Sequence, residues 1–269
     1  TRHGLFQLQQ HGRRLFHRLH ALVGRAEIDR GKGHGAEILL HAALHQKAGH
    51  RKEVVVVQVL EKFLHSGGQP ALGVPVFVPC READGWQPDM ERAAQYLTPR
   101  TKALVINTPN NPTGVCYSRP TLEAVARFAR KNDLLVVADD IYTSFCYSEP
   151  FLPVLTLPGM KERTVAINSF SKNFVMTGFR VGNIVAPEPI ARAVKSINDS
   201  VVYSAPAPSQ RAALHALRRR KELAAQIVPE FSARMAYGAQ RIRELPGFTL
   251  SLRNNEADYI VVEPLEQAG

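Results

Sequence analysis

Three reactive side-chain types each follow a short apolar run in this sequence. They are Asn111 after residues 103–106, Asp139 after residues 134–138 and Lys172 after residues 164–167. Ligands of open α/β sheets bind outside the carboxyl ends of parallel strands, so these positions are candidates for one site. A carboxylate that ends a buried run needs a cation or hydrogen-bond donors, because unpaired burial costs several kcal/mol. Taken alone, Asp139 could equally cap a neighbouring helix or meet water.

The elements that must position these groups follow an α/β pattern. From Gly73 onward, short apolar runs alternate with longer helical patterns, which predicts a mostly parallel sheet flanked by helices. Strands are expected at residues 74–78, 103–106, 134–138, 164–167 and 181–186, the first of them at a sheet edge because of its prolines. Helices are expected from residue 118 or 119, and over residues 189–199, 208–218 and 222–243. Short strands at residues 248–252 and 259–262 would begin a smaller α+β domain.

Four motifs in a fixed order connect this pattern to a known family. In chain order they are Asn107-Thr-Pro-Asn-Asn-Pro-Thr-Gly114, Asp139-Asp-Ile-Tyr142, Ser169-Phe-Ser-Lys172 and Gly178-Phe-Arg180. Together with the connecting sequence from about Gly73 to Phe248, they resemble the class I/II aminotransferases of the pyridoxal-phosphate fold type I superfamily. The resemblance implies a fragment of an enzyme that moves an amino group between an amino acid and a 2-oxo acid. It also implies a homodimer with its sites at the subunit interface.

The resemblance gives four residues roles at the reacting end of pyridoxal 5′-phosphate. Lys172 would bind the cofactor covalently and, as a free amine, move the proton between the substrate Cα and the cofactor C4′. Asp139 would keep the pyridine nitrogen protonated, so that the ring accepts electrons. Asn111 and Tyr142 would hydrogen-bond the phenolate oxygen and stabilise its charge.

A second group of residues would hold the cofactor phosphate. By the same resemblance, Arg180 would bind it together with the hydroxyls of Ser169 and Ser171, since Arg suits bidentate, charge-assisted contacts. The flanking Gly178 and Gly182 would let the backbone come close.

The sequence also departs from the family. Asp140 stands where relatives often carry Glu, and no family-like arm, phosphate-binding turn or partner-reaching tyrosine precedes Gly73. The arginine that binds the substrate carboxylate in the family does not fall within the part of the sequence that resembles it. The alternatives are therefore a pyridoxal-phosphate-dependent β-lyase on the same fold and a catalytically inactive fragment or basic binding module.

Residues 1–72 differ in composition from the rest of the 269 residues. They hold nine of the ten His but no Tyr, Asn, Met, Cys or Trp, and they carry 11 basic and five acidic residues toward the net charge of +10. We predict that this segment is read in a shifted frame or disordered, that residues 73–220 form the cofactor-binding large domain, and that residues 221–269 form an interdomain helix and a truncated small domain.

Other partners are disfavoured by the same patterns. Glu37, His41 and His45 have a spacing that could bind zinc, but the remaining His residues do not converge on them, so no metal is expected. Residues 1–72 are basic but show no recognition-helix pattern and few aromatic residues, which argues against binding to nucleic acid. No apolar run approaches the roughly 20 residues of a membrane span. The cysteines, Cys80, Cys116 and Cys146, are spaced too widely for a disulfide framework or metal knuckle. Reduced thiols and a cytoplasmic location are therefore expected.

Overall fold

The fold is built on one six-stranded sheet. A computed structural model describes residues 52–57, 73–111, 113–246, 248–250 and 262–264. The strands, in chain order, are β1 (Lys52–Val57), β2 (Gly73–Val78), β3 (Thr101–Asn107), β4 (Leu135–Asp139), β5 (Thr164–Ser169) and β6 (Gly182–Val185). Their order in the sheet is β2-β1-β3-β4-β5-β6, and every neighbouring pair is parallel except β5 and β6. The mostly parallel sheet and the edge position of β2 are both confirmed.

Two strands show what the sequence did not predict. β1 lies within residues 1–72, which we set apart on composition, yet it pairs with both β2 and β3 and lies between them in the sheet. The remainder of that segment, including Glu37, His41 and His45, lies outside the described residues. β6 was expected as a strand, but its antiparallel direction was not, because direction depends on the turn that returns the chain.

Helices flank the sheet as expected. They are α4 (Met90–Ala94), α5 (Arg119–Lys131), α6 (Phe170–Asn173), α7 (Glu188–Val201), α8 (Ala207–Arg218) and α9 (Arg220–Arg243). α5 begins where Ser118 caps it, its Oγ accepting a hydrogen bond from Thr121 N at 3.3 Å, and Pro120 occupies an early position where a missing N–H is harmless. No helix in these described ranges is both long and apolar enough to cross a membrane.

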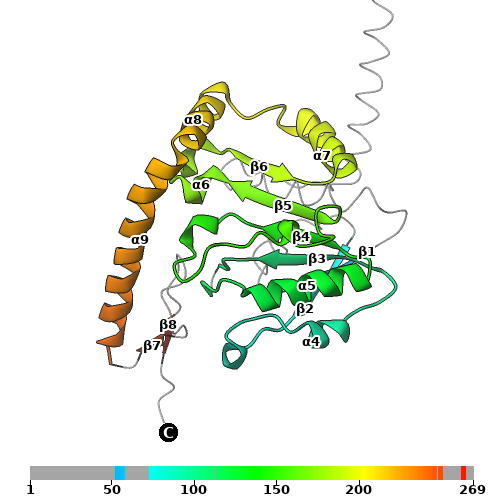
Figure 1. Ribbon diagram of the computed structural model, residues 1–269, viewed down its shortest axis with the longest axis horizontal. Helices are drawn as coiled ribbons and strands as arrows, with labels where there is room; N and C mark the ends of the chain where they lie inside the picture. Colours follow the sequence, from blue (N-terminus) through cyan, green and yellow to red (C-terminus); the bar gives the residue numbers. More distant parts are fainter. Residues whose placement is uncertain (1–51, 58–72, 112, 247, 251–261, 265–269) are drawn as a thin grey trace, which may run out of the picture.

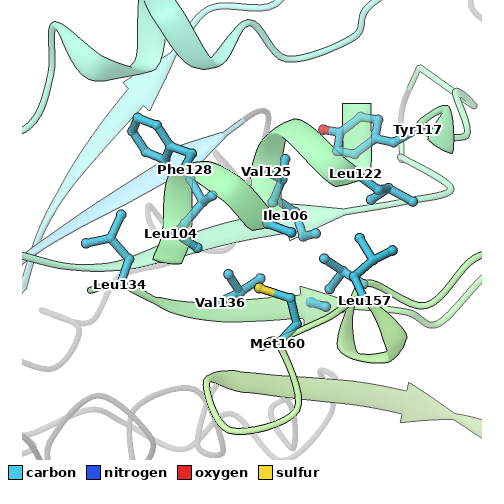
Figure 2. Packing of buried hydrophobic residues seen from close by; sticks show 14 of the residues in the cluster. Leu104, Ile106, Tyr117, Leu122, Val125, Phe128, Leu134, Val136, Leu157 and Met160 are labelled. Carbon is cyan, nitrogen blue, oxygen red and sulfur yellow. The ribbon is translucent and has the colours of Figure 1, made fainter. Parts of the chain in front are cut away.

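Side chains on the two faces of the sheet form two separate cores. Leu104, Ile106 and Val136 alternate toward α5 and pack with its buried face, as Figure 2 shows. The intervening Ala103 and Val105 belong to the second cluster, which includes Ile190 and Val194 of α7. Burial on both faces explains why β3 and β4 are continuous apolar runs.

The long helix α9 lies beside one end of the sheet. In Figure 1 the arrowheads of β3 and β5 point toward the side along which α9 runs, down to the short strands β7 (Phe248–Leu250) and β8 (Val262–Pro264). Phe231 of α9 packs against Phe145 of the turn η2 (Thr143–Phe145), with ring centroids 5.2 Å apart. The carboxyl ends of the parallel strands therefore face α9.

Candidate active site

The ends of β3 and β4 are tied together by one amide. Asn107 and Asp139 are register partners, and Asn107 Nδ2 donates a 3.1 Å hydrogen bond to the main-chain oxygen of Asp139. Asn107 Oδ1 accepts a hydrogen bond from Asn111 N at 2.9 Å. This buried side chain thus fixes both the strand end that carries Asp139 and the loop that carries Asn111.

The loop after β3 holds its own shape. Asn110 Oδ1 accepts hydrogen bonds from Thr113 N and Thr113 Oγ1 at 3.2 and 2.8 Å. Gly114 adopts a φ of 75°, a conformation that glycine reaches without steric cost, and its N–H bonds Asn110 O at 2.7 Å. The Asn-Pro-Thr-Gly motif is therefore a preformed turn that presents Asn111 at the sheet edge.

Three candidate residues from three strand ends meet at Tyr142. Asn111 Nδ2 donates to Tyr142 Oη at 3.4 Å, and Lys172 Nζ lies 5.4 Å from the centroid of the Tyr142 ring. This ring is buried, and an ammonium within about 6 Å of an aromatic face is attracted by its electrons. The tertiary structure thus brings together residues 31 and 30 positions apart in the chain.

Two neighbouring carboxyls lie at the end of β4, where Asp140 is buried and Asp139 is half-buried. Burial raises the pKa of Asp139 to about 7, and burial together with the adjacent Asp139 raises the pKa of Asp140 to about 7. Neither carboxyl forms an ion pair with any residue that the structure describes. A cationic group brought to Asp139 would therefore be strongly stabilised and would lower this pKa again.

The short helix α6 carries Lys172 and is anchored at both ends. Ser169 caps it, its Oγ accepting a hydrogen bond from Ser171 N at 3.1 Å. Phe170 and Met176 are buried with Ala213 and Ala216 of α8. Burial of the flanking apolar residues leaves Lys172 half-exposed at the edge of the sheet.

Arg180 reaches back toward the same helix. Its Nη1 donates to Thr177 O at 2.9 Å and to Ser171 Oγ at 3.5 Å. The residue itself has a φ of 51°, a conformation that non-glycine residues rarely adopt and that clusters at ligand sites. Arg180, Ser171 and Ser169 therefore form one exposed to half-buried polar group suited to an anion.

The two glycines near Arg180 differ. A Cβ at Gly182 would lie 2.6 Å from Asn168 O, so the close approach of β6 to β5 requires glycine. A Cβ at Gly178 would have no atom within 4 Å. Gly182 is thus required by the packing of β6 against β5, whereas the approach of the backbone at both glycines to the cofactor phosphate stays a prediction.

Sequence reasoning missed two asparagines that position the site. Asn107 begins the first of the four motifs, but no role was predicted for it. Asn173, directly after Lys172, accepts a hydrogen bond from Ser144 N at 3.1 Å and donates to Thr143 Oγ1 at 2.9 Å, which links α6 to the turn after Tyr142. Their signal is an amide at a strand end or beside a reactive residue, but their partners lie about 30 residues away and cannot be inferred from spacing.

Comparison with known proteins decides the family. The model of the family described as Aminotransferase class I and II matches residues 65–266. The chain belongs to this family. Aspartate/prephenate aminotransferase of Thermus thermophilus is 37% identical over 196 residues, covering 71% of this chain and 49% of that protein. Aromatic-amino-acid aminotransferase 2 of Thermococcus litoralis is 41% identical over 150 residues, covering 54% of this chain and 38% of that protein.

Solved aminotransferases share the fold. A tetra mutant of the aspartate aminotransferase of Thermus thermophilus superimposes with a TM-score of 0.74 at 31% identity, covering 86% of this chain and 62% of that one. Class I/II aminotransferases depend on pyridoxal phosphate. The chain spans about half or less of the length of the curated relatives it matches, covering 39–50% of three of them, the Thermus thermophilus protein included.

The residues present fit the cofactor of this family. Asp139 presents a carboxyl whose charge the cationic pyridinium nitrogen would compensate. Arg180 and Ser171 offer hydrogen-bond donors to a phosphate. Asn111 and Tyr142 present neighbouring hydrogen-bonding groups, with the Lys172 amine over the same ring. Within the part of the chain that the structure describes, no group of three or more His, Cys, Asp or Glu could hold a metal ion.

Proposed function

We propose that this chain is the cofactor-binding part of a pyridoxal-phosphate-dependent aminotransferase that moves an amino group between an amino acid and a 2-oxo acid. The observation that supports it most directly is the meeting of Asn111, Tyr142 and Lys172 at the carboxyl ends of β3, β4 and β5. Beside them, the carboxyl of Asp139 has no ion-pair partner among the residues that the structure describes. When bound, pyridoxal phosphate supplies an electron sink for the charge left on the substrate Cα.

Lys172 is the proposed nucleophile and base. Its amine would hold the cofactor covalently and, once free, would move a proton from the substrate Cα to the cofactor C4′. The ring of Tyr142 and the anchored helix α6 restrict where this amine can lie, since catalysis requires reacting atoms in a defined geometry.

The other residues bind and orient. Asp139 would hold a proton on the pyridine nitrogen, because a cation at its side best compensates the charge of a poorly solvated carboxylate. Asn111 and Tyr142 would hydrogen-bond the phenolate oxygen and stabilise its charge. Arg180, Ser169 and Ser171 would hold the phosphate, and the hydrogen bonds from Arg180 to Thr177 O and Ser171 Oγ keep the guanidinium near α6.

The proposal extends to the whole protein. We expect an amino acid and a 2-oxo acid as its small-molecule substrates, a homodimer and a cytoplasmic location. We also propose that residues 73–220 form the cofactor-binding domain, joined in the sheet by β1, and that residues 221–269 begin a smaller domain. Size-exclusion chromatography with light scattering tests the dimer.

The test is direct detection of cofactor attachment. The purified chain is mixed with pyridoxal phosphate, reduced with borohydride and digested, and the modified peptide is identified by mass spectrometry. We expect the label on Lys172 and its loss in Lys172→Ala, whereas Lys161→Ala, at an exposed lysine, keeps it. Label scattered over surface lysines would overturn the assignment. With substrates added, amino transfer supports the aminotransferase, whereas release of ammonia and pyruvate would indicate the β-lyase.

A further inference from the structure

Two cysteines that are far apart in sequence lie side by side near the site. Cys116 follows the Asn-Pro-Thr-Gly turn and Cys146 follows η2, and their Sγ atoms are 2.9 Å apart. This separation is roughly 0.9 Å longer than the about 2.05 Å bond of a disulfide. The spacing of 30 residues had argued against pairing, but the chain returns through β4 and brings the two thiols into contact.

The pair connects the two segments that present Asn111 and Tyr142. Cys116 lies five residues after Asn111, and Cys146 lies four residues after Tyr142. The segments already meet through the Asn111–Tyr142 hydrogen bond, while Phe145 is held against Phe231 of α9. Because both segments are held in place, the sulfurs need little rearrangement to come within bonding distance.

Both thiols are half-buried, so a small reagent can reach them. The remaining cysteine, Cys80, makes a natural contrast. Burial and the nearby Asp84 and Asp89 raise the pKa of the Cys80 thiol to about 12, which suppresses the reactive thiolate form. No contact between Cys80 and another cysteine sulfur occurs among the residues that the structure describes.

We propose that Cys116 and Cys146 form an oxidation site, at which a peroxide converts the two thiols into a disulfide that a dithiol reverses. One thiolate attacks a peroxide oxygen, the O–O bond breaks, and the leaving hydroxide takes up a proton to become water. The second sulfur then attacks the resulting sulfenic sulfur, and its S–O bond breaks to release a second water. Two thiols lose two electrons and one hydrogen peroxide gains them.

The disulfide cross-links the loops that present the proposed cofactor ligands. It closes a loop of about 30 residues in the unfolded chain, which predicts a rise in Tm of about 5–10 °C on oxidation. The site needs no cofactor, so it can form whether or not the proposed aminotransferase function is correct.

Peptide mapping of the purified full chain tests the proposal. Trypsin releases Cys116 within residues 103–127 and Cys146 within residues 132–161, because Pro120 protects the bond after Arg119. After treatment with hydrogen peroxide, we expect these two peptides to be joined, two hydrogens lighter than their sum, and separated by dithiothreitol. This measurement on the unaltered chain requires no variant to fold.

Matched variants complete the test. Cys116→Ser and Cys146→Ser should each abolish the joined peptide and the rise in Tm, whereas Cys80→Ser should keep both. Peroxide treatment that leaves the two peptides separate, or that joins either of them to the Cys80 peptide as readily, would overturn the proposal. So would a joined peptide with an unchanged or lower Tm, since the cross-link would then distort the loops instead of holding them.

Discussion

The half-buried carboxyl of Asp139 should make the cofactor-free chain less stable as the pH rises. Its pKa is raised from 3.8 in the unfolded chain to about 7 in the folded one. The folded state therefore binds the proton more tightly, and this contribution to stability is fully present below pH 3.8 and is lost as the pH rises through 7. The shift of about 3 units corresponds to about 4 kcal/mol, of which about 2–3 kcal/mol is lost between pH 5 and pH 8.

Asp139→Asn removes this loss because an amide does not titrate in that range. Without cofactor, we expect the variant to gain about 2–3 kcal/mol relative to wild type when the pH changes from 5 to 8, or roughly 5–10 °C in Tm. The adjacent Asp140 should add to the gain, since the charge of Asp139 is one cause of its raised pKa. Urea unfolding at both pH values measures the difference.

The control is Asp133→Asn. The side chain of Asp133 is 85% exposed and pairs with Arg163 at 3.2 Å on the surface, and Asn tolerates its φ of 47°. Such a pair contributes at most about 1 kcal/mol, so this control should respond little to pH. Adding pyridoxal phosphate should stabilise wild type more than Asp139→Asn, because only the carboxylate attracts the pyridinium. If Asp139→Asn has the same pH dependence as wild type, the pKa of Asp139 is not raised as the site requires.

Three further predictions concern the elements around the site. Asn173→Ala removes the hydrogen bonds from α6 to Ser144 N and Thr143 Oγ1 and should lower the free energy of unfolding in urea by about 1–3 kcal/mol. It should also weaken cofactor binding in a titration, and unchanged binding would make Asn173 purely structural. Gly182→Ala forces a Cβ against Asn168 O and should lower the free energy of unfolding by about 1–3 kcal/mol, as measured by thermal unfolding. The control is Gly178→Ala, whose Cβ would meet open space, and equal effects of the two variants would contradict the close approach of β6 to β5. Leu122→Ala removes a fully buried side chain on the inner face of α5 and should lower the free energy of unfolding by about 2–5 kcal/mol. A loss below about 1 kcal/mol would show that the core collapses around the missing side chain.

Much of the fold could be predicted because its signals are local. The apolar run at residues 103–106 became β3 with one or two more residues at each end, and Ser118 with Pro120 marked the start of α5 correctly. β1 could not be predicted in this way. Its Val-rich run stands in a segment of unusual composition, and its place between β2 and β3 depends on pairing with strands far along the chain.

The candidate site divides along the same line. By itself, the sequence determined the identity and order of the motif residues, because an amine, a carboxyl and an amide after successive apolar runs must reach one edge of a parallel sheet. Only the tertiary structure decided that Asn111 and Lys172 meet at Tyr142, that Asn107 and Asn173 hold the strand ends together, and that Cys116 contacts Cys146. Strand and helix signals act over a few residues, whereas these contacts join positions about 30 residues apart through hydrogen bonds and packing that exist only once the chain has folded.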